Sequence, residues 1–535
     1  MTNPTTPIAD LVILGVRVVT DTASFDAGVA IKDGQILAIG EERAMPTARE
    51  TFDATGLHLL PGAIDVHVHF REPGYTHKED WQTGTAAAAM GGVTTVFEMP
   101  NVDPPTATPE ALALKQEAAK KAHVDYGLYG LLAEDNIDQL EALIDGGVAG
   151  FKCFMGNTFG NLPSPSTGAM LEGFEIIAGR GLRIALHAET ASIIARREKR
   201  LQSAGRTDPL AHLASRPAVV AIEAVSRAAV LAEWTGARIH ILHISSADEL
   251  RPLHEAKARG VDITGETCPH YLLFDERAYT DHRSIIRVNP PVRERRHQVG
   301  LWEGLRDGTI DMIATDHAPH IPAEKLRNDI WTVDCGFPGV ETQMPLMLTQ
   351  VRAGRLSLSD YVRLASTKPA KAFGLYPAKG TLLPGSDADI TLVDLNREDT
   401  IAAAQFQSRS KITPFEGMKV TGIPVHTLVR GRFVMKDRQI VGETRGWGRS
   451  VRRIQRMPPP QPKNSDQTLV AVTRGVGAAG ASRKATGEGW RQQAEPLENP
   501  SLGRSRSGAL RMTDVSASSL AAGWDLGRKM GSRQE

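Results

Sequence analysis

The segment that contains His67, His69 and Arg71 places three reactive side chains at alternating positions. Its apolar neighbours predict a β-strand, and residues two apart on a strand share one face. Two imidazoles on one face can bind a divalent transition metal such as zinc. The Arg71 guanidinium adds a planar fork that suits a carboxylate. The histidine pair alone would equally fit a half-buried strand with local hydrogen bonds, so the rest of the chain must decide.

Four further candidate residues lie in or directly after short apolar runs elsewhere in the chain. His187, His243 and Asp316 each follow such a run, and Lys152 lies inside one. An unpaired ammonium in an apolar strand would be costly to bury. Each histidine taken singly is also explained by a structural hydrogen bond. Together with the first histidine pair, these residues form a set of metal ligands that is hard to reach by chance.

The pattern between residues 61 and 375 alternates short apolar runs with amphipathic helical stretches. The expected strands are 92–99, 126–131, 150–154, 183–187, 238–243, 262–266 and 312–315, with helices such as 109–121 and 218–234 between them. This alternation predicts an α/β fold, a (β/α)8 TIM-type barrel. Because active sites of such barrels lie at the C-terminal strand ends, we expect the candidate ligands to converge.

The two ends of the main body predict a small β domain. Residues 1–60 contain short strands, with Asp33-Gly34 typical of a hairpin, and residues 376–445 return to short strands with glycine turns. We expect both segments to form one composite β-sandwich. Residues 446–535 carry 15 basic against 7 acidic residues and lack sustained periodicity. They predict a disordered basic tail, to which we assign no function.

Composition is that of an ordinary soluble protein with room for more than one domain. No apolar run is long enough to span a bilayer, and the N-terminus lacks the features of a secretory signal. Cys153, Cys268 and Cys335 form no C-x-x-C pair, and their odd number argues against a disulfide framework. We expect a cytoplasmic protein without membrane or nucleic-acid partners, because the basic tail lacks interleaved aromatic residues.

Seven segments make the chain resemble the amidohydrolase superfamily and, within it, the dihydroorotases. They are 65–74 (DVHVHFREPG), 99–101 (MPN), 150–152 (GFK), 186–189 (LHAE), 289–291 (NPP), 314–320 (ATDHAPH) and 413–417 (TPFEG). The resemblance covers roughly residues 8–445. It implies a binuclear centre of two divalent ions, expected to be Zn²⁺, held by His67, His69, Lys152, His187, His243 and Asp316. Lys152 would be carboxylated, its CO2-derived carbamate bridging both ions.

The same resemblance implies a substrate. It assigns Arg71, Asn101 and His320 to a substrate carboxylate and Asn289 to the substrate ring. Allantoinase-like sequences usually lack the arginine and end the aspartate motif in cysteine. The expected function is therefore dihydroorotase, the reversible cyclisation of N-carbamoyl-L-aspartate to L-dihydroorotate in pyrimidine biosynthesis. Other segments, such as 265–271, are at least as allantoinase-like, so an allantoinase or hydantoinase is the alternative.

Asp316 is the expected catalytic residue. A metal-activated hydroxide would attack the ring carbonyl, and Asp316 would accept its proton and pass it to the leaving amide nitrogen. A further alternative is a non-catalytic scaffold beside aspartate transcarbamoylase, and an active enzyme could also associate with that partner. The complete set of six candidate ligands favours an enzyme. The resemblance also implies a homo-oligomer.

Overall fold

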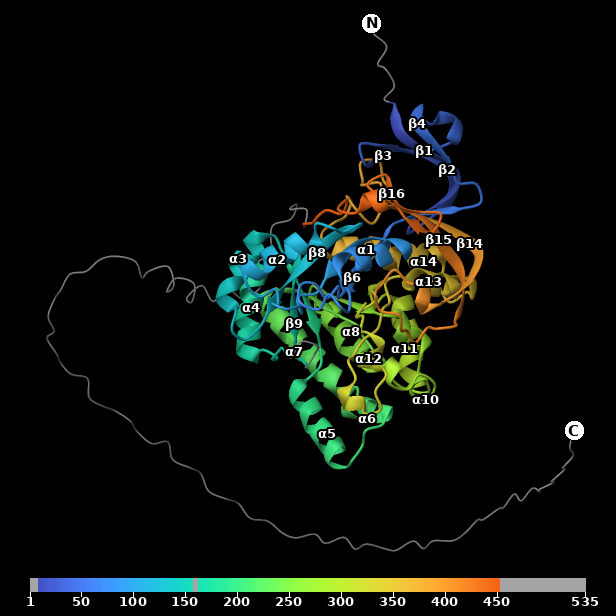
Figure 1. Cartoon of the computed structure of the whole chain (residues 1–535). Coiled ribbons are helices and arrows are strands. Elements are labelled where there is room, and N and C mark those ends of the chain that lie inside the picture. The colour runs from blue at the N-terminus through green and yellow to red at the C-terminus, as the bar shows by residue number, and fades with distance from the viewer. Residues whose placement is uncertain (1–7, 157–161, 453–535) are drawn as a thin grey trace, which may run out of the picture. The chain divides into compact units, whose positions relative to one another are not determined.

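The computed structural model describes residues 8–156 and 162–452 (Figure 1). Two sheets organise them, one parallel with eight strands and one with nine strands. The predicted α/β fold, a barrel with a separate sheet domain, is confirmed. The predicted tail from residue 453 onward lies outside the described residues. In the described ranges, no helix is both long and apolar enough to cross a membrane.

Eight parallel strands form the barrel in the order of the sequence. They are β6 (Ala63–Val68), β7 (Val93–Glu98), β8 (Asp125–Leu132), β9 (Gly150–Phe154), β10 (Arg183–His187), β11 (Arg238–Ile241), β12 (Ile263–Thr267) and β13 (Met312–Ile313). Almost every residue of these strands is buried. This burial explains why the runs are nearly continuously apolar in sequence, since one side faces the interior and the other faces helices.

The barrel closes between β6 and the segment that follows β13. The backbone N–H of His69 donates to the carbonyl of His317 at 2.8 Å, and the N–H of His317 donates to the carbonyl of His67 at 3.3 Å. A parallel bridge also joins the two segments. Closure therefore sets His67 in β6 and His69 directly after it beside Asp316, which is distant in sequence.

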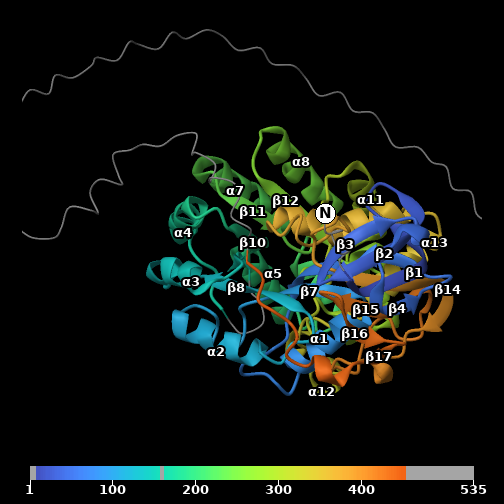
Figure 2. The ribbon, with the colours of Figure 1, turned by 90° about the horizontal axis from the view of Figure 1, so that it is seen from above.

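Helices surround the strands (Figure 2). They are α1 (Trp81–Met90), α2 (Pro109–Ala119), α3 (Leu140–Gly146), α4 (Thr167–Gly179), α5 (Ala191–Ser203), α6 (Pro209–Ser215), α7 (Val219–Thr235), α8 (Leu250–Ala258), α9 (Pro269–Leu273), α10 (Ala278–Asp281), α11 (Arg295–Asp307), α12 (Pro322–Lys325), α13 (Gln343–Arg352), α14 (Leu358–Val362) and α15 (Lys368–Ala372). The start of α2 follows from its sequence, because Thr108 accepts a hydrogen bond from the N–H of Ala111 and Pro109 suits the first turn.

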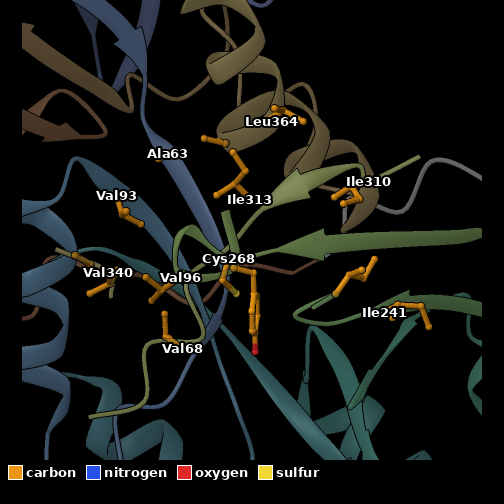
Figure 3. Close-up of a cluster of buried hydrophobic side chains, with 14 of the residues drawn as sticks. Ala63, Val68, Val93, Val96, Ile241, Cys268, Ile310, Ile313, Val340 and Leu364 are labelled. Carbon is orange, nitrogen blue, oxygen red and sulfur yellow. The ribbon is translucent and has the colours of Figure 1, made fainter. Parts of the chain in front are cut away.

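A buried apolar cluster packs the strands against these helices (Figure 3). Val68, Val93 and Val96 contribute from β6 and β7, and Ile241 and Ile313 contribute from β11 and β13. Each of these five side chains is at most 1% exposed. Branched side chains of this kind fill the space between strands and helices and so fix where the strand ends lie.

Both ends of the described chain build the second sheet, drawn in blue and orange in Figure 1. Its strands are β1 (Ala9–Val19), β2 (Ser24–Lys32), β3 (Gln35–Gly40), β4 (Ala48–Asp53), β5 (His58–Pro61), β14 (Ile390–Thr400), β15 (Lys419–Val429), β16 (Arg432–Lys436) and β17 (Gln439–Ile440). The antiparallel pair of β5 with β14 joins the residues before the barrel to those after it. Asp33 and Gly34, both at positive φ, form the predicted β2–β3 hairpin turn.

The last described residues return to the barrel. Gly446 and Gly448 donate their N–H groups to the carbonyl of Ala122, and the N–H of Val451 donates to the carbonyl of Tyr126 at 2.8 Å. A Cβ at Gly448 would lie too close to the backbone just before β8, so only glycine fits there. The sequence placed residues 446–452 in the tail, whereas the structure packs them against the barrel, because these backbone groups find partners beside β8.

A buried ionic cluster ties the barrel to the second sheet. The Lys379 ammonium lies 2.7 Å from an oxygen of Asp125, 3.0 Å from one of Asp387 and 2.6 Å from one of Asp389. Asp125 begins β8, and Asp389 directly precedes β14. Burial alone would lower the pKa of Lys379, but the carboxylates of Asp389, Asp125 and Asp387 raise it. Lys379 is therefore a charged link between the two sheets.

We predict that Lys379→Met lowers the free energy of unfolding by about 3–5 kcal/mol, because it leaves buried carboxylates without their cation. Urea unfolding followed by circular dichroism measures the change. The matched control is Arg296→Met, which removes an exposed partner of Asp248 and should cost less than about 1 kcal/mol. Equal losses in the two variants would contradict the role of the buried cluster.

Candidate active site

A cavity lies at the C-terminal ends of the barrel strands. Its lining comprises His67, His69, Arg71, Asn101, Lys152, Phe154, His187, His243, Asn289, Asp316, Ala318 and Cys335. Apart from His320, all the site residues predicted from the sequence are in this lining. The barrel thus gathers side chains that are spread over some 250 positions of the chain.

One group of ligand atoms forms around Asp316. The Nε2 atoms of His67 and His69 each lie 3.2 Å from Oδ1 of Asp316, and all three side chains are buried. The three atoms are close enough to hold one cation between them. Burial lowers the pKa of both histidines well below the usual value, which keeps the imidazoles neutral and able to offer a lone pair.

A second group lies across the cavity. Nδ1 of His187 is 2.9 Å from Nε2 of His243, and Nδ1 of His243 has no hydrogen-bond partner among the described residues. The Lys152 ammonium lies beside them, 4.5 Å from the centre of the Phe154 ring. Burial lowers the pKa of Lys152 to about 7, although Asp316 and Glu266 oppose this shift. A share of Lys152 is therefore neutral amine near neutral pH.

Three residues of the site have a left-handed backbone. The φ angles are 62° at Arg71, 38° at His243 and 48° at Asp316. Residues other than glycine rarely adopt this conformation, and where they do the surrounding structure must hold them. Each of the three lies two or three residues after the end of a barrel strand, so the backbone turns as the side chain enters the cavity.

His67 and His69 each make a hydrogen bond through Nδ1, the ring nitrogen that does not face Asp316. Nδ1 of His67 lies 2.6 Å from Oε1 of Glu266, and Nδ1 of His69 lies 2.8 Å from Oδ1 of Asn101. Such contacts fix the ring orientation and leave the other nitrogen, Nε2, to face the cavity. Asn101 thus orients His69 as well as lining the cavity, a role that the sequence did not predict.

A similar arrangement supports His187. Its Nε2 lies 3.0 Å from Oε2 of Glu189, and Glu189 is also paired with the guanidinium of Arg216. All three side chains are buried. Burial raises the pKa of Glu189, but Arg216 and His187 outweigh it and lower that pKa to about 2, so the carboxylate is charged. Glu189 and Glu266 were not predicted from the sequence, although a carboxylate in a buried segment beside a candidate ligand is itself informative.

His320 lies behind Arg71 and does not line the cavity. Nη2 of Arg71 donates to Nε2 of His320 at 3.1 Å, and Nε of Arg71 donates to the carbonyl of Pro319 at 3.3 Å. The other nitrogen of His320 lies 3.1 Å from the Lys78 ammonium. Its imidazole is fully buried between two cationic side chains, so the contact of His320 with a substrate carboxylate stays a prediction.

Neutral imidazoles, a carboxylate and a partly neutral amine around one buried cavity form a donor set that suits divalent transition metals. Burial raises the pKa of Asp316 to about 8, while Lys152 opposes the shift. A carboxyl buried in this way is stabilised by a nearby cation. The residues present therefore fit the implied metal ions.

Comparison with known proteins gives consistent results. Residues 58–434 match the Amidohydrolase family. An L-hydantoinase of Paenarthrobacter aurescens is 37% identical over 450 residues, which cover 83% of this chain and 98% of that protein. An allantoinase of Rubrobacter xylanophilus is 38% identical over 441 residues, 82% of this chain and 96% of that protein. The solved structure of L-hydantoinase (dihydropyrimidinase) from Arthrobacter aurescens has a TM-score of 0.81 and 36% identity, covering 83% of this chain and 100% of that one.

The chain belongs to the amidohydrolase family. It is a hydrolase, and the predicted class of enzyme, acting on cyclic amide C–N bonds, is confirmed. The predicted dihydroorotase activity is wrong, because the relatives named above are a hydantoinase and an allantoinase. The expected role in pyrimidine biosynthesis and the association with aspartate transcarbamoylase lose their basis with it. The motifs that suggested dihydroorotase, around Arg71 and His320, did not determine the substrate.

Proposed function

We propose that the protein hydrolyses the five-membered cyclic ureide ring that hydantoins and allantoin share. The observation that carries this proposal is the similarity to a hydantoinase and an allantoinase over 96% or more of their lengths. The gathering of all six candidate ligands around one cavity supports an active enzyme. Water would add across one ring C–N bond and release an N-carbamoyl amino acid.

The six candidate ligands would hold two divalent metal ions, which we expect to be Zn²⁺. The ions would supply a water of lowered pKa and polarise the ring carbonyl. Lys152 would bridge them as a carbamate. This modification requires a neutral amine that adds CO2 and releases a proton, and the lowered pKa of Lys152 favours that form.

Asp316 would move the proton during ring opening. Its carboxylate would accept a proton from the attacking water and then donate it to the ring nitrogen as the C–N bond breaks. Burial raises the pKa of Asp316 towards neutrality, so its carboxyl group can both hold and release a proton near neutral pH. The positive φ of Asp316 aims the side chain at the cavity from the seam where the barrel closes.

Arg71 would select the substituent on the ring. Its guanidinium is 1% exposed, lines the cavity and offers only hydrogen-bond donors. A substituent that carries an acceptor, such as the ureido carbonyl of allantoin, would therefore be favoured over a purely apolar one. Asn289, from the loop before α11, would contact the ring, and Asn101 would act through His69.

The first prediction of the proposed function concerns the substrate. We expect turnover of allantoin to exceed that of 5-benzylhydantoin and of the six-membered dihydrouracil in parallel assays with zinc-loaded protein. Arg71→Met should lower kcat/KM for allantoin by about 10-fold or more, the effect of one charge-assisted hydrogen bond, and change that for 5-benzylhydantoin much less. Equal losses on both hydantoins would remove Arg71 from substituent selection, and turnover of dihydrouracil alone would contradict the five-membered ring.

The second prediction concerns Asp316. Asp316→Asn should lower kcat by about 100-fold or more, because an amide oxygen cannot accept the proton. Steady-state rates with allantoin, together with elemental analysis of bound metal, measure the effect. Asp311→Asn is the matched control. Asp311 contacts Lys257 and precedes the N-terminal end of β13, whereas Asp316 follows the C-terminal end. A normal kcat in Asp316→Asn would exclude its role in proton transfer.

The third prediction concerns Lys152. Metal-stripped protein should regain activity with added divalent metal and bicarbonate, and much more slowly in CO2-free buffer, because the bridging carbamate must form first. Lys152→Met should fail to recover under either condition. Recovery of the unmodified protein at the same rate with and without bicarbonate would speak against the carbamate.

A further inference from the structure

A line of polar side chains, three buried and Thr264 partly buried, runs through the barrel interior beneath the cavity. It consists of Arg183 at the start of β10, His240 in β11, and Thr264 and Glu266 in β12. Arg183, His240 and Glu266 are each at most 3% exposed. Buried polar groups are costly unless they are hydrogen-bonded, so a continuous line of them in a barrel core calls for an explanation. We call these four residues the interior line.

The contacts of the interior line are continuous. Nη1 of Arg183 donates to Oγ1 of Thr264 at 3.3 Å, and this oxygen lies 2.9 Å from Nδ1 of His240. Nε2 of His240 lies 3.0 Å from Oε2 of Glu266. The other oxygen of Glu266 lies 2.6 Å from Nδ1 of His67. The line therefore begins near one end of the barrel and ends on a candidate metal ligand at the other.

Fixed donors set the direction of these hydrogen bonds. The Arg183 guanidinium only donates, so the Thr264 oxygen accepts from it and the Thr264 hydroxyl donates to His240, and a neutral imidazole then donates through its other nitrogen. Nε2 of His240 must therefore carry the proton that Glu266 accepts, and its Nδ1 accepts from the Thr264 hydroxyl. Both oxygens of Glu266 accept from a fixed donor, His240 on one and the backbone N–H of His243 on the other. Nδ1 of His67 therefore carries a proton towards Glu266, and Nε2 of His67 keeps its lone pair towards the cavity.

Both ends of the interior line are anchored. Arg183 donates to the carbonyl of Ala372 at 2.9 Å, to that of Ile239 at 2.7 Å and to a carboxylate oxygen of Asp262 at 2.7 Å. At the other end, Glu266 also accepts the backbone N–H of His243 at 3.2 Å. With His240 and this N–H as fixed donors, the carboxylate of Glu266 is held as an acceptor for His67.

We propose that Arg183, Thr264 and His240 are positioning residues that fix the tautomer of His67, so that Nε2 of His67 offers its lone pair to the cavity before any metal ion binds. They touch neither substrate nor reacting atoms. This inference rests on the proposed metal-dependent function and extends it to residues deep in the barrel. It predicts a metal site that is preorganised by a group four hydrogen bonds away.

The decisive variant is Thr264→Val, which removes one hydroxyl and keeps the shape of the side chain. We expect it to raise the dissociation constant for Zn²⁺, measured by competition with a chelator, by about 10-fold or more. Thr95→Val is the matched control. Thr95 is also a buried threonine in a barrel strand, but its hydroxyl has no hydrogen-bond partner in the described part of the chain. Unchanged zinc affinity in Thr264→Val would overturn the proposal.

A second pair of variants tests His240. Glutamine can donate to Glu266 and accept from Thr264, so His240→Gln should keep the visible spectrum of the Co²⁺-substituted protein close to that of the unmodified protein. His240→Leu offers neither bond and should change that spectrum and weaken metal binding. The same spectrum and affinity in His240→Leu would contradict the proposal. If His240→Leu does not fold, Thr264→Val remains decisive.

A measurement without metal separates this inference from the proposed function. In metal-free protein labelled with ¹⁵N-histidine, the nitrogen shifts of His67, assigned with His67→Gln, should indicate a single Nδ1–H tautomer. Thr264→Val should shift them towards a mixture. Failure to hydrolyse any cyclic ureide would overturn the proposed function and leave this result intact. A tautomer mixture in the unmodified protein would overturn the inference whatever the substrate.

Discussion

Closure of the barrel is the constraint on which the rest of the site depends. Two backbone hydrogen bonds join the end of β6 to the segment after β13, and they bring His67 and His69 to Asp316. Neighbouring strands supply the other candidate ligands, because in-register parallel strands end at one level. An open sheet with the same strands would leave its first and last members far apart. The ring of strands thus converts distant sequence positions into adjacent ligand atoms.

Burial of this cluster explains its chemistry. Each of its ionisable groups is shifted towards its neutral form, since the barrel interior offers little solvation for charge. Neutral imidazoles and an amine can then act as ligands, and Asp316 can exchange a proton near neutral pH. The groups that stay charged, such as Glu189, are those with a buried cationic partner such as Arg216. The site therefore combines neutral side chains that can donate a lone pair to a metal ion with surrounding pairs of charged side chains. These charge pairs keep the ligands oriented.

The sequence was sufficient for the architecture and for the candidate ligands that gather around the cavity, and insufficient for the rest. Strand-helix alternation and the position of residues such as His187 at strand ends are local features, and local features predict a barrel and its rim. The orientation of His320 depends on contacts with Arg71 and Lys78, which no local pattern contains. Glu266 was missed for the same reason, although polar residues at alternate positions of a buried strand are a usable indication of an interior face. Substrate preference was misjudged because short motifs are shared between enzymes that open different rings.

The pairing of β5 with β14 has a consequence for synthesis on the ribosome. The first five strands emerge before any of the barrel, yet the partner of β5 appears only after the barrel is complete. Until then β5 presents an unpaired edge, which is open to wrong partners. Contacts so distant in sequence form slowly, because a long loop must close first. The barrel therefore has to assemble while the early strands wait, and the second sheet is completed only after the strands that follow the barrel have been made.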